Sequence, residues 1–169
     1  AALLTRSGVV AVLATRGTVE SENFSRLRDA HGGEVRILAQ ACPGLVEQVE
    51  AGALDSAETR RLLADYALPL QAQGADTFVL ACTHYPFLAA GLRTLLGPAV
   101  TIIDPAPAVA RELRRRLRLA DALSTVTEPG QTLAYTTGDA GRFAAQLAAL
   151  GASPAAVAGL ALPAASATA

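Results

Sequence analysis

Short apolar runs separated by amphipathic stretches dominate the pattern of this chain. Four runs rich in Val, Ile and Leu are too short for buried helices and predict strands at residues 9–14, 34–40, 76–81 and 100–103. Apolar residues recur at helical spacing between these runs, which predicts intervening helices. Strands that alternate with helices indicate an α/β fold with a doubly wound parallel sheet. Ligands of such folds lie beyond the carboxyl ends of the strands.

Capping signals predict where several of these helices begin. Thr18-Val19-Glu20-Ser21 is similar to a capping box, so we expect a helix to begin at Thr18. Asp55 is expected to cap the long helix after the second strand. Pro86 is expected to restart helical structure after the third strand, and Gly97 to stop it.

The periodic pattern weakens toward the end of the chain. Residues 1–103 contain the four predicted strands and are expected to form an α/β domain. Residues 104–151 are expected to form a helix-strand-helix segment, and residues 152–169, which are rich in Ala and carry no charge, a flexible tail. Because the chain begins with Ala1 and contains no Met, we also expect its true start to lie upstream.

Composition and charge exclude several classes of function. The chain is 51% hydrophobic, which is enough for a buried core, and its formal net charge is -1. This near-neutral charge argues against a surface for nucleic acid or for an acidic membrane. No apolar run is long enough to span a bilayer and no secretory signal opens the chain, so a cytoplasmic location is expected.

Two cysteines, Cys42 and Cys82, are present, and neither belongs to a CxxC pair. This arrangement predicts two free thiols, with no zinc site and no disulfide framework. We interpret Cys42, which precedes a helix-starting proline, as a small core residue. Cys82 follows a predicted strand, where a lone cysteine is often inert as well, so its assignment depends on its neighbours.

The neighbours of Cys82 make it a candidate base. A thiol between a buried strand and a helix start feels the positive end of the helix dipole, which favours the reactive thiolate. His84 is a candidate to polarise Cys82 or to exchange protons with it. The hydroxyl groups of Thr15, Thr18 and Thr83, with free backbone N–H groups at helix starts, suit a small carboxylate ligand.

Two of the candidates have a second interpretation. Thr18 is explained equally by a capping role in its helix. Glu50 is either a surface carboxylate near the end of a short helix or a functional group of the same site.

Arg114-Arg115-Arg116 is interpreted as a solvated helix face.

Four motifs follow one another along the chain: Leu13-Ala14-Thr15-Arg16-Gly17-Thr18-Val19, then Ala41-Cys42-Pro43-Gly44-Leu45-Val46 with Glu50, then Leu80-Ala81-Cys82-Thr83-His84-Tyr85-Pro86, and last Tyr135-Thr136-Thr137-Gly138-Asp139. Together they resemble the C-terminal part of glutamate racemases, which belong to the aspartate and glutamate racemase family. The resemblance covers roughly residues 8 to 151, and the ordered set is far more specific than any single motif.

This resemblance implies interconversion of L-glutamate and D-glutamate by two-base proton transfer without metal or other cofactor. The product D-glutamate would serve peptidoglycan synthesis and so the cell wall and cell shape. By resemblance, Cys82 is the base on the L-glutamate face, His84 and Glu50 assist it, and Thr83 binds substrate. Thr15 and Thr18 are expected to bind substrate because their hydroxyls suit a carboxylate. A homodimer is the assembly that the resemblance suggests.

In one respect the chain departs from the family. Glutamate racemases also carry an Asp-Ser-Gly loop and a Cys-Asn-Thr motif with the first catalytic cysteine, and neither occurs here. Cys42 matches a non-catalytic position, so the chain alone is expected to be inactive. The family counterparts of residues 104–151 pack on that other portion, so these residues are expected to expose apolar surface.

Two alternatives stay open at this point. One is a racemase of the aspartate or hydantoin type, against which His84-Tyr85-Pro86 argues because the aspartate relatives usually carry an acidic residue after Cys-Thr. The other is a catalytically dead remnant that binds a dicarboxylate or a protein partner.

Overall fold

Two compact units make up the fold in a computed structural model, which describes residues 1–161. The first unit comprises residues 1–123 and the second begins at Ser124. Helix α6 (Ala106–Leu119) therefore belongs to the first unit, whereas the sequence pattern groups it with the residues that follow. Each unit is described by itself.

A four-stranded parallel sheet forms the centre of the first unit. Its strands are β1 (Val9–Ala14), β2 (Arg36–Ala41), β3 (Thr77–Ala81) and β4 (Thr101–Ile103), in the order β2-β1-β3-β4. Strand β1 is nearly continuous in burial because both of its neighbours and helices on both faces cover it. The four strands and the parallel α/β class predicted from the apolar runs are confirmed.

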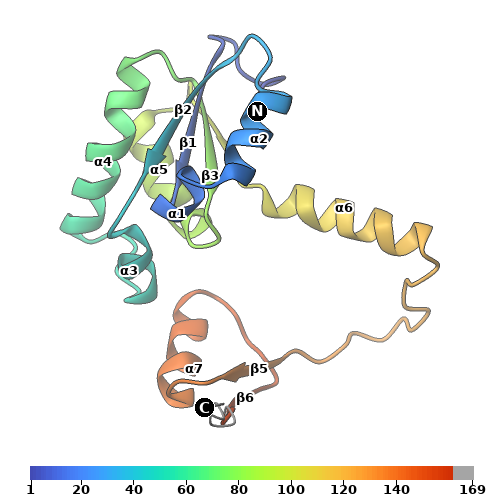
Figure 1. Cartoon of the computed structure of the whole chain (residues 1–169). Helices are drawn as coiled ribbons and strands as arrows, with labels where there is room; N and C mark the ends of the chain where they lie inside the picture. Colours follow the sequence, from blue (N-terminus) through green and yellow to red (C-terminus); the bar gives the residue numbers. More distant parts are fainter. Residues whose placement is uncertain (162–169) are drawn as a thin grey trace, which may run out of the picture. The chain divides into compact units, whose positions relative to one another are not determined.

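Helices cover both faces of this sheet (Figure 1). Helices α4 (Ala57–Ala72) and α5 (Ala89–Leu96) lie on one side and α2 (Glu22–His31) on the other. Shorter elements join strands to these helices: α1 (Arg16–Val19), α3 (Leu45–Glu50) and the 3-10 turn η1 (Tyr85–Leu88). The sheet is therefore doubly wound, as the alternation of elements predicts.

Alternate side chains of the central strands build the core on the two faces. On the face toward α2, Val10 and Val12 pack with Phe24 and Ile37. On the opposite face Phe78 and Leu80 are completely buried, and the leucines of α4 and α5 that are buried are Leu62, Leu63, Leu70, Leu92 and Leu96. Because successive side chains of a strand point to opposite faces of the sheet, each apolar run packs against the helices on both sides.

Serine hydroxyls cap two helices where the sequence pattern predicts other residues. Ser21 accepts a hydrogen bond from the N–H of Phe24 at 3.1 Å, so α2 begins at Glu22 and the prediction of Thr18 as its start is wrong. Ser56, and not Asp55, caps α4. Both serines have extended backbone angles that bring the hydroxyl onto the N–H three residues later, which is the geometry of a helix N-cap.

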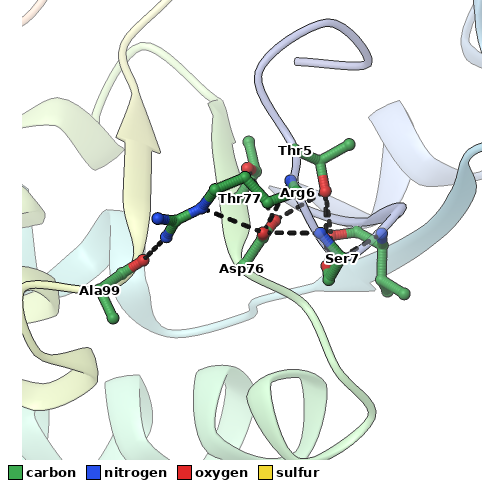
Figure 2. A network of polar contacts seen from close by, with 7 residues as sticks. Thr5, Arg6, Ser7, Asp76, Thr77 and Ala99 are labelled. Carbon is green, nitrogen blue, oxygen red and sulfur yellow. Dashed lines mark hydrogen bonds and ion pairs between the residues drawn. The ribbon is translucent and has the colours of Figure 1, made fainter.

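Asp76 fastens the N-terminal segment to the start of β3 (Figure 2). Its carboxylate accepts hydrogen bonds from the Thr5 hydroxyl at 2.7 Å, from the N–H groups of Arg6 and Ser7 at 2.8 and 2.9 Å, and from the Thr77 hydroxyl at 3.0 Å. Burial alone would raise the pKa of Asp76, but these four hydrogen bonds outweigh it and lower the pKa well below the ordinary value. The network therefore depends on an ionised Asp76.

Helix α6 is amphipathic but has no buried residue. Figure 1 shows it leaving the sheet without packing on it. Val109, Leu113 and Leu119 are 64%, 57% and 75% exposed. The expectation of exposed apolar surface after residue 104 is confirmed for this helix. None of the helices among residues 1–161 combines the length and the apolar character needed to cross a membrane.

Up to residue 161, the second unit contains a small parallel sheet and one helix. Its elements are β5 (Leu133–Thr136), α7 (Ala140–Ala149) and β6 (Ala156–Gly159), with β6 paired to β5. The prediction of a flexible tail from residue 152 onward is wrong where β6 forms. Small Ala and Gly side chains give no periodic signal there, and the pairing comes from backbone hydrogen bonds such as that from Leu160 N–H to the Thr136 carbonyl. Residues 162–169 of the predicted tail lie outside the described residues.

Candidate active site

Three strands of the sheet end at the same level. Ala14, the last residue of β1, is in register with Ala41 of β2 and with Ala81 of β3. The next residues along the chain, Thr15, Cys42 and Cys82, therefore follow aligned carboxyl ends. This edge is where the α/β topology predicts a ligand site.

Cys82 lies against the imidazole of His84. Its Sγ is 3.9 Å from Nδ1 of His84, and the hydroxyl oxygen of Thr83 is 3.4 Å from the same nitrogen. Cys82 is partly exposed and forms no disulfide. A thiol at this distance from an imidazole nitrogen has a partner that can accept or return its proton.

Glu50 completes a line of three groups with Cys82 and His84. Its Oε1 is 3.3 Å from Nε2 of His84, and the side chains of His84 and Glu50 are 32% and 55% exposed. A carboxylate at Nε2 favours the tautomer that has its proton on that nitrogen. The lone pair of Nδ1 then faces Cys82 and Thr83. The structure thus brings Glu50 to the predicted site, although it comes from a different element, α3.

A 3-10 turn follows Cys82 instead of an α-helix. Tyr85–Leu88 form this turn, and α5 begins only at Ala89. The prediction that helical structure restarts at Pro86 is confirmed, with its first turn in 3-10 form. The argument from a helix dipole at Cys82 is weakened, because one 3-10 turn sums few peptide dipoles. The group in contact with the Cys82 thiol is the imidazole of His84.

Thr15 and Thr18 lie together at the end of β1. Their hydroxyl oxygens are 3.0 Å apart, and Thr15 accepts a hydrogen bond from the N–H of Thr18 at 3.4 Å. The cap of the short helix α1 is Thr15, so the capping role considered for Thr18 falls to its neighbour. Each hydroxyl keeps further hydrogen-bonding capacity.

The two thiols differ in environment. Cys42 is 1% exposed, and its Sγ donates to the carbonyl of Gln40 at 3.4 Å. Burial raises the pKa of the Cys42 thiol to about 12. Cys42 therefore remains a protonated core residue, as predicted, while Cys82 is accessible.

Beside this edge lies an apolar cavity. It has a volume of about 760 Å³, extends between α2 and the sheet, and is lined by residues that include Thr18 and Ala81. Cys82 and His84 do not line it. Within residues 1–161, no group of three or more His, Cys, Asp and Glu side chains is arranged to hold a metal ion.

The fold and this site define a class of α/β protein with acid–base side chains at the carboxyl edge of a parallel sheet. The profile of the Asp/Glu/Hydantoin racemase family matches residues 1–113. This chain belongs to that family.

Individual relatives agree with this assignment. The chain is 49% identical over 148 residues to a glutamate racemase from Ectopseudomonas mendocina, a match that covers 87% of this chain and 56% of the relative. It superposes with a TM-score of 0.81 and 28% identity on a glutamate racemase from Bacillus anthracis, covering 95% of this chain and 59% of that one. The glutamate racemase of Escherichia coli, solved with L-glutamate and the activator UDP-MurNAc-ala, matches with a TM-score of 0.75 and 26% identity over 96% of this chain and 61% of that one.

The chain spans about half the length of the curated relatives that it matches. The part that it matches is their C-terminal part. The carboxyl-edge residues described above all lie within the range that the family profile matches.

Proposed function

We propose that this chain supplies one of two acid–base thiols for the cofactor-independent interconversion of L-glutamate and D-glutamate. The observation that carries this proposal is the line Cys82–His84–Glu50 at the aligned strand ends. The names of the relatives supply the substrate, because the site geometry by itself indicates only proton transfer near a small anion.

Proton transfer at Cys82 follows from its contact with His84. Nδ1 of His84 takes the thiol proton, and the resulting thiolate removes the α-proton of L-glutamate, which becomes the S–H proton. A second acid on the opposite face of the carbanion then donates a different proton to the α-carbon, and the configuration is inverted. In the reverse direction the Cys82 thiol is the donor. Glu50 stabilises the imidazolium that forms in between.

Substrate binding is assigned to hydroxyl groups around the same edge. Thr83 is next to Cys82, and Thr15 and Thr18 lie at the adjacent strand end. Their hydroxyls can donate to the carboxylates of glutamate and would hold the α-carbon at the thiol.

In this proposal the second thiol comes from outside these 169 residues. They contain two cysteines, and Cys42 is buried with a raised pKa. We therefore propose that the chain alone does not racemise glutamate, and that the complete site forms with a further polypeptide portion that bears the other thiol. In this proposal the enzyme is cytoplasmic and its D-glutamate enters peptidoglycan.

A chimera tests the proposal directly. The portion of the Ectopseudomonas mendocina relative that this chain does not match would be fused to the chain, and conversion of L-glutamate measured by chiral chromatography, with L-aspartate in parallel. We expect glutamate to be racemised by the chimera and not by the isolated chain. Cys82→Ala should abolish the reaction, whereas Cys42→Ala should retain it because its side chain takes no part.

Three results would count against the proposal. Preference for aspartate would assign a different substrate within the same family. Racemisation by the isolated chain would show that no second portion is needed. A folded chimera that binds glutamate but leaves its α-proton unexchanged in D₂O would favour a binding remnant.

A further inference from the structure

We propose that Tyr85 is a positioning residue that holds Cys82 and His84 in their mutual geometry by tying them to the ends of two other strands. Only the link between this geometry and catalysis rests on the proposed function. The positioning of the thiol and the imidazole by the buried hydroxyl can be examined in the isolated chain.

The hydroxyl of Tyr85 reaches across the sheet edge. It lies 3.2 Å from the carbonyl oxygen of Ala14 and 3.1 Å from that of Cys42, and donates to both. Tyr85 is 1% exposed, and its side chain is among the largest that are fully buried in the described part of the chain. One phenol proton shared between two carbonyls is a bifurcated hydrogen bond that joins the loop after β3 to the ends of β1 and β2.

This bond closes a short loop around the candidate catalytic groups. At one end of the loop, Ala81 is held in β3 by its pairing with β1. At the other end, Tyr85 is held by its hydroxyl, and its N–H donates to the carbonyl of Cys82 at 3.2 Å. Only Cys82, Thr83 and His84 lie between the two fixed points. A shift of the Tyr85 ring is therefore passed directly to the thiol and the imidazole.

Chemistry suits Tyr85 to a permanent donor role. Burial raises its pKa above the ordinary value, with further upward contributions from Cys42, Cys82, Glu47 and Tyr66. The phenol therefore keeps its proton throughout the range in which an enzyme works. Phenylalanine would fill the same space in the core but would leave the two carbonyls without this donor.

A double-mutant cycle separates positioning from ordinary core packing. The rate at which iodoacetamide alkylates Cys82 would be followed by mass spectrometry in the 169-residue chain between about pH 6 and pH 10, which spans the ordinary thiol range. The variants are Tyr85→Phe, His84→Gln and both together. Tyr66→Phe is the matched control, since Tyr66 donates to the carbonyl of Pro43 at 2.9 Å but lies on α4.

If Tyr85 positions the pair, His84→Gln should change the alkylation rate of Cys82 less in the Tyr85→Phe background than in the original chain. We expect a difference of at least about threefold, a size typical of coupled residues. Tyr66→Phe should leave the effect of His84→Gln unchanged. Replacement of Tyr85 by 4-aminophenylalanine, which keeps a donor at the ring tip, should restore the coupling, and it decides the question if Tyr85→Phe does not fold.

Equal effects of His84→Gln in both backgrounds, with an unchanged pH profile for Tyr85→Phe, would overturn the proposal and leave Tyr85 as a core residue. Failure of 4-aminophenylalanine to restore the coupling would overturn it as well. Neither result depends on racemisation, so a chimera without activity would refute the proposed function and leave this inference standing.

Discussion

Nε2 of His84 lies 3.3 Å from Oε1 of Glu50, which is 34 positions earlier in the chain. The contact joins the last residue of α3 to the loop that follows β3. A carboxylate at this nitrogen favours the tautomer of His84 that has its proton on Nε2. We therefore propose that Glu50 acts on the Cys82 thiol through His84.

Glu50→Gln should weaken proton transfer while largely preserving substrate binding. An amide can still contact Nε2 but cannot stabilise the imidazolium. In the racemase chimera we expect kcat to fall by about tenfold to a hundredfold, less than the largest effects of losing a direct acid or base, with a smaller change in KM. Glu47→Gln, on the exposed side of the same helix, serves as the control. Equal kcat values for the two variants would exclude the assigned role of Glu50.

Alkylation of the native chain should modify one cysteine. Cys42 is 1% exposed and burial raises its pKa to about 12, whereas Cys82 is partly exposed beside His84. At about pH 8, below the ordinary thiol pKa, intact-mass analysis should show a single iodoacetamide adduct, located at Cys82 by peptide mapping. The chain unfolded in urea should take up two, and Cys82→Ser should take up none while folded. Rapid modification of Cys42 in the native chain would contradict its burial.

Asp76→Asn should destabilise the first unit. The amide keeps one acceptor oxygen but presents an N–H₂ group to the backbone donors of Arg6 and Ser7, which Oδ2 accepts in the structure. We expect a loss of about 1–3 kcal/mol in the free energy of unfolding, measured by urea titration near neutral pH. Asp55→Asn, which removes an exposed ion pair with Arg60, should change this free energy much less.

The effect of Asp76 should depend on pH with a defined sign. The folded-state pKa of Asp76 is lowered, so its stabilisation is fully present above the unfolded pKa of about 3.9 and is lost as the pH falls toward the folded value. The difference in unfolding free energy between the original chain and Asp76→Asn should therefore shrink below about pH 4. A difference that stays constant through this range would show that the network does not depend on the charge.

Thr59→Val tests the joint between α3 and α4. Thr59 is completely buried. Its hydroxyl lies 3.1 Å from Oε1 of Gln48 and also hydrogen bonds with the carbonyl of Ala53. Valine has nearly the same shape but no hydroxyl, so we expect a loss of about 1–3 kcal/mol in the free energy of unfolding. Thr94→Val removes an exposed hydroxyl that bonds only to its own helix, at Ala90, and should cost within about 0.5 kcal/mol. Similar losses for both variants would argue against a structural joint at Thr59.

The sheet and the location of the site could be predicted from sequence because both depend on local signals. Buried apolar runs such as Val9–Ala14 predict strands, and polar residues directly after them must gather at one edge when the strands are parallel. These signals predict the positions of Cys82 and Thr15 at this edge. The proximity of His84 to Cys82 follows from their separation of two residues.

Contacts between distant segments had weaker signals or none. The position of Glu50 after the second strand makes it a candidate for the site, but its assisting role comes only from the family resemblance, because nothing in a helix-end carboxylate indicates which imidazole it contacts. The contacts of the Tyr85 hydroxyl have no signal in the sequence, since its acceptors are backbone carbonyls at the ends of other strands. The wrong cap predicted for α4 has a local cause: Asp55 and Ser56 are neighbours and both residue types suit a helix N-cap, but Ser56 takes that position.

The shared register of the strand ends restricts how the length of this chain can vary. Ala14 pairs with both Ala41 and Ala81, and the site residues follow immediately. Deletion of one residue within β3 would carry Thr83 into the place of Cys82 and turn the apolar side chains of the strand to the opposite face. The turn at Gly74, before β3, is free of this restriction. Insertions and deletions among natural homologues should therefore collect in such turns and spare the strands.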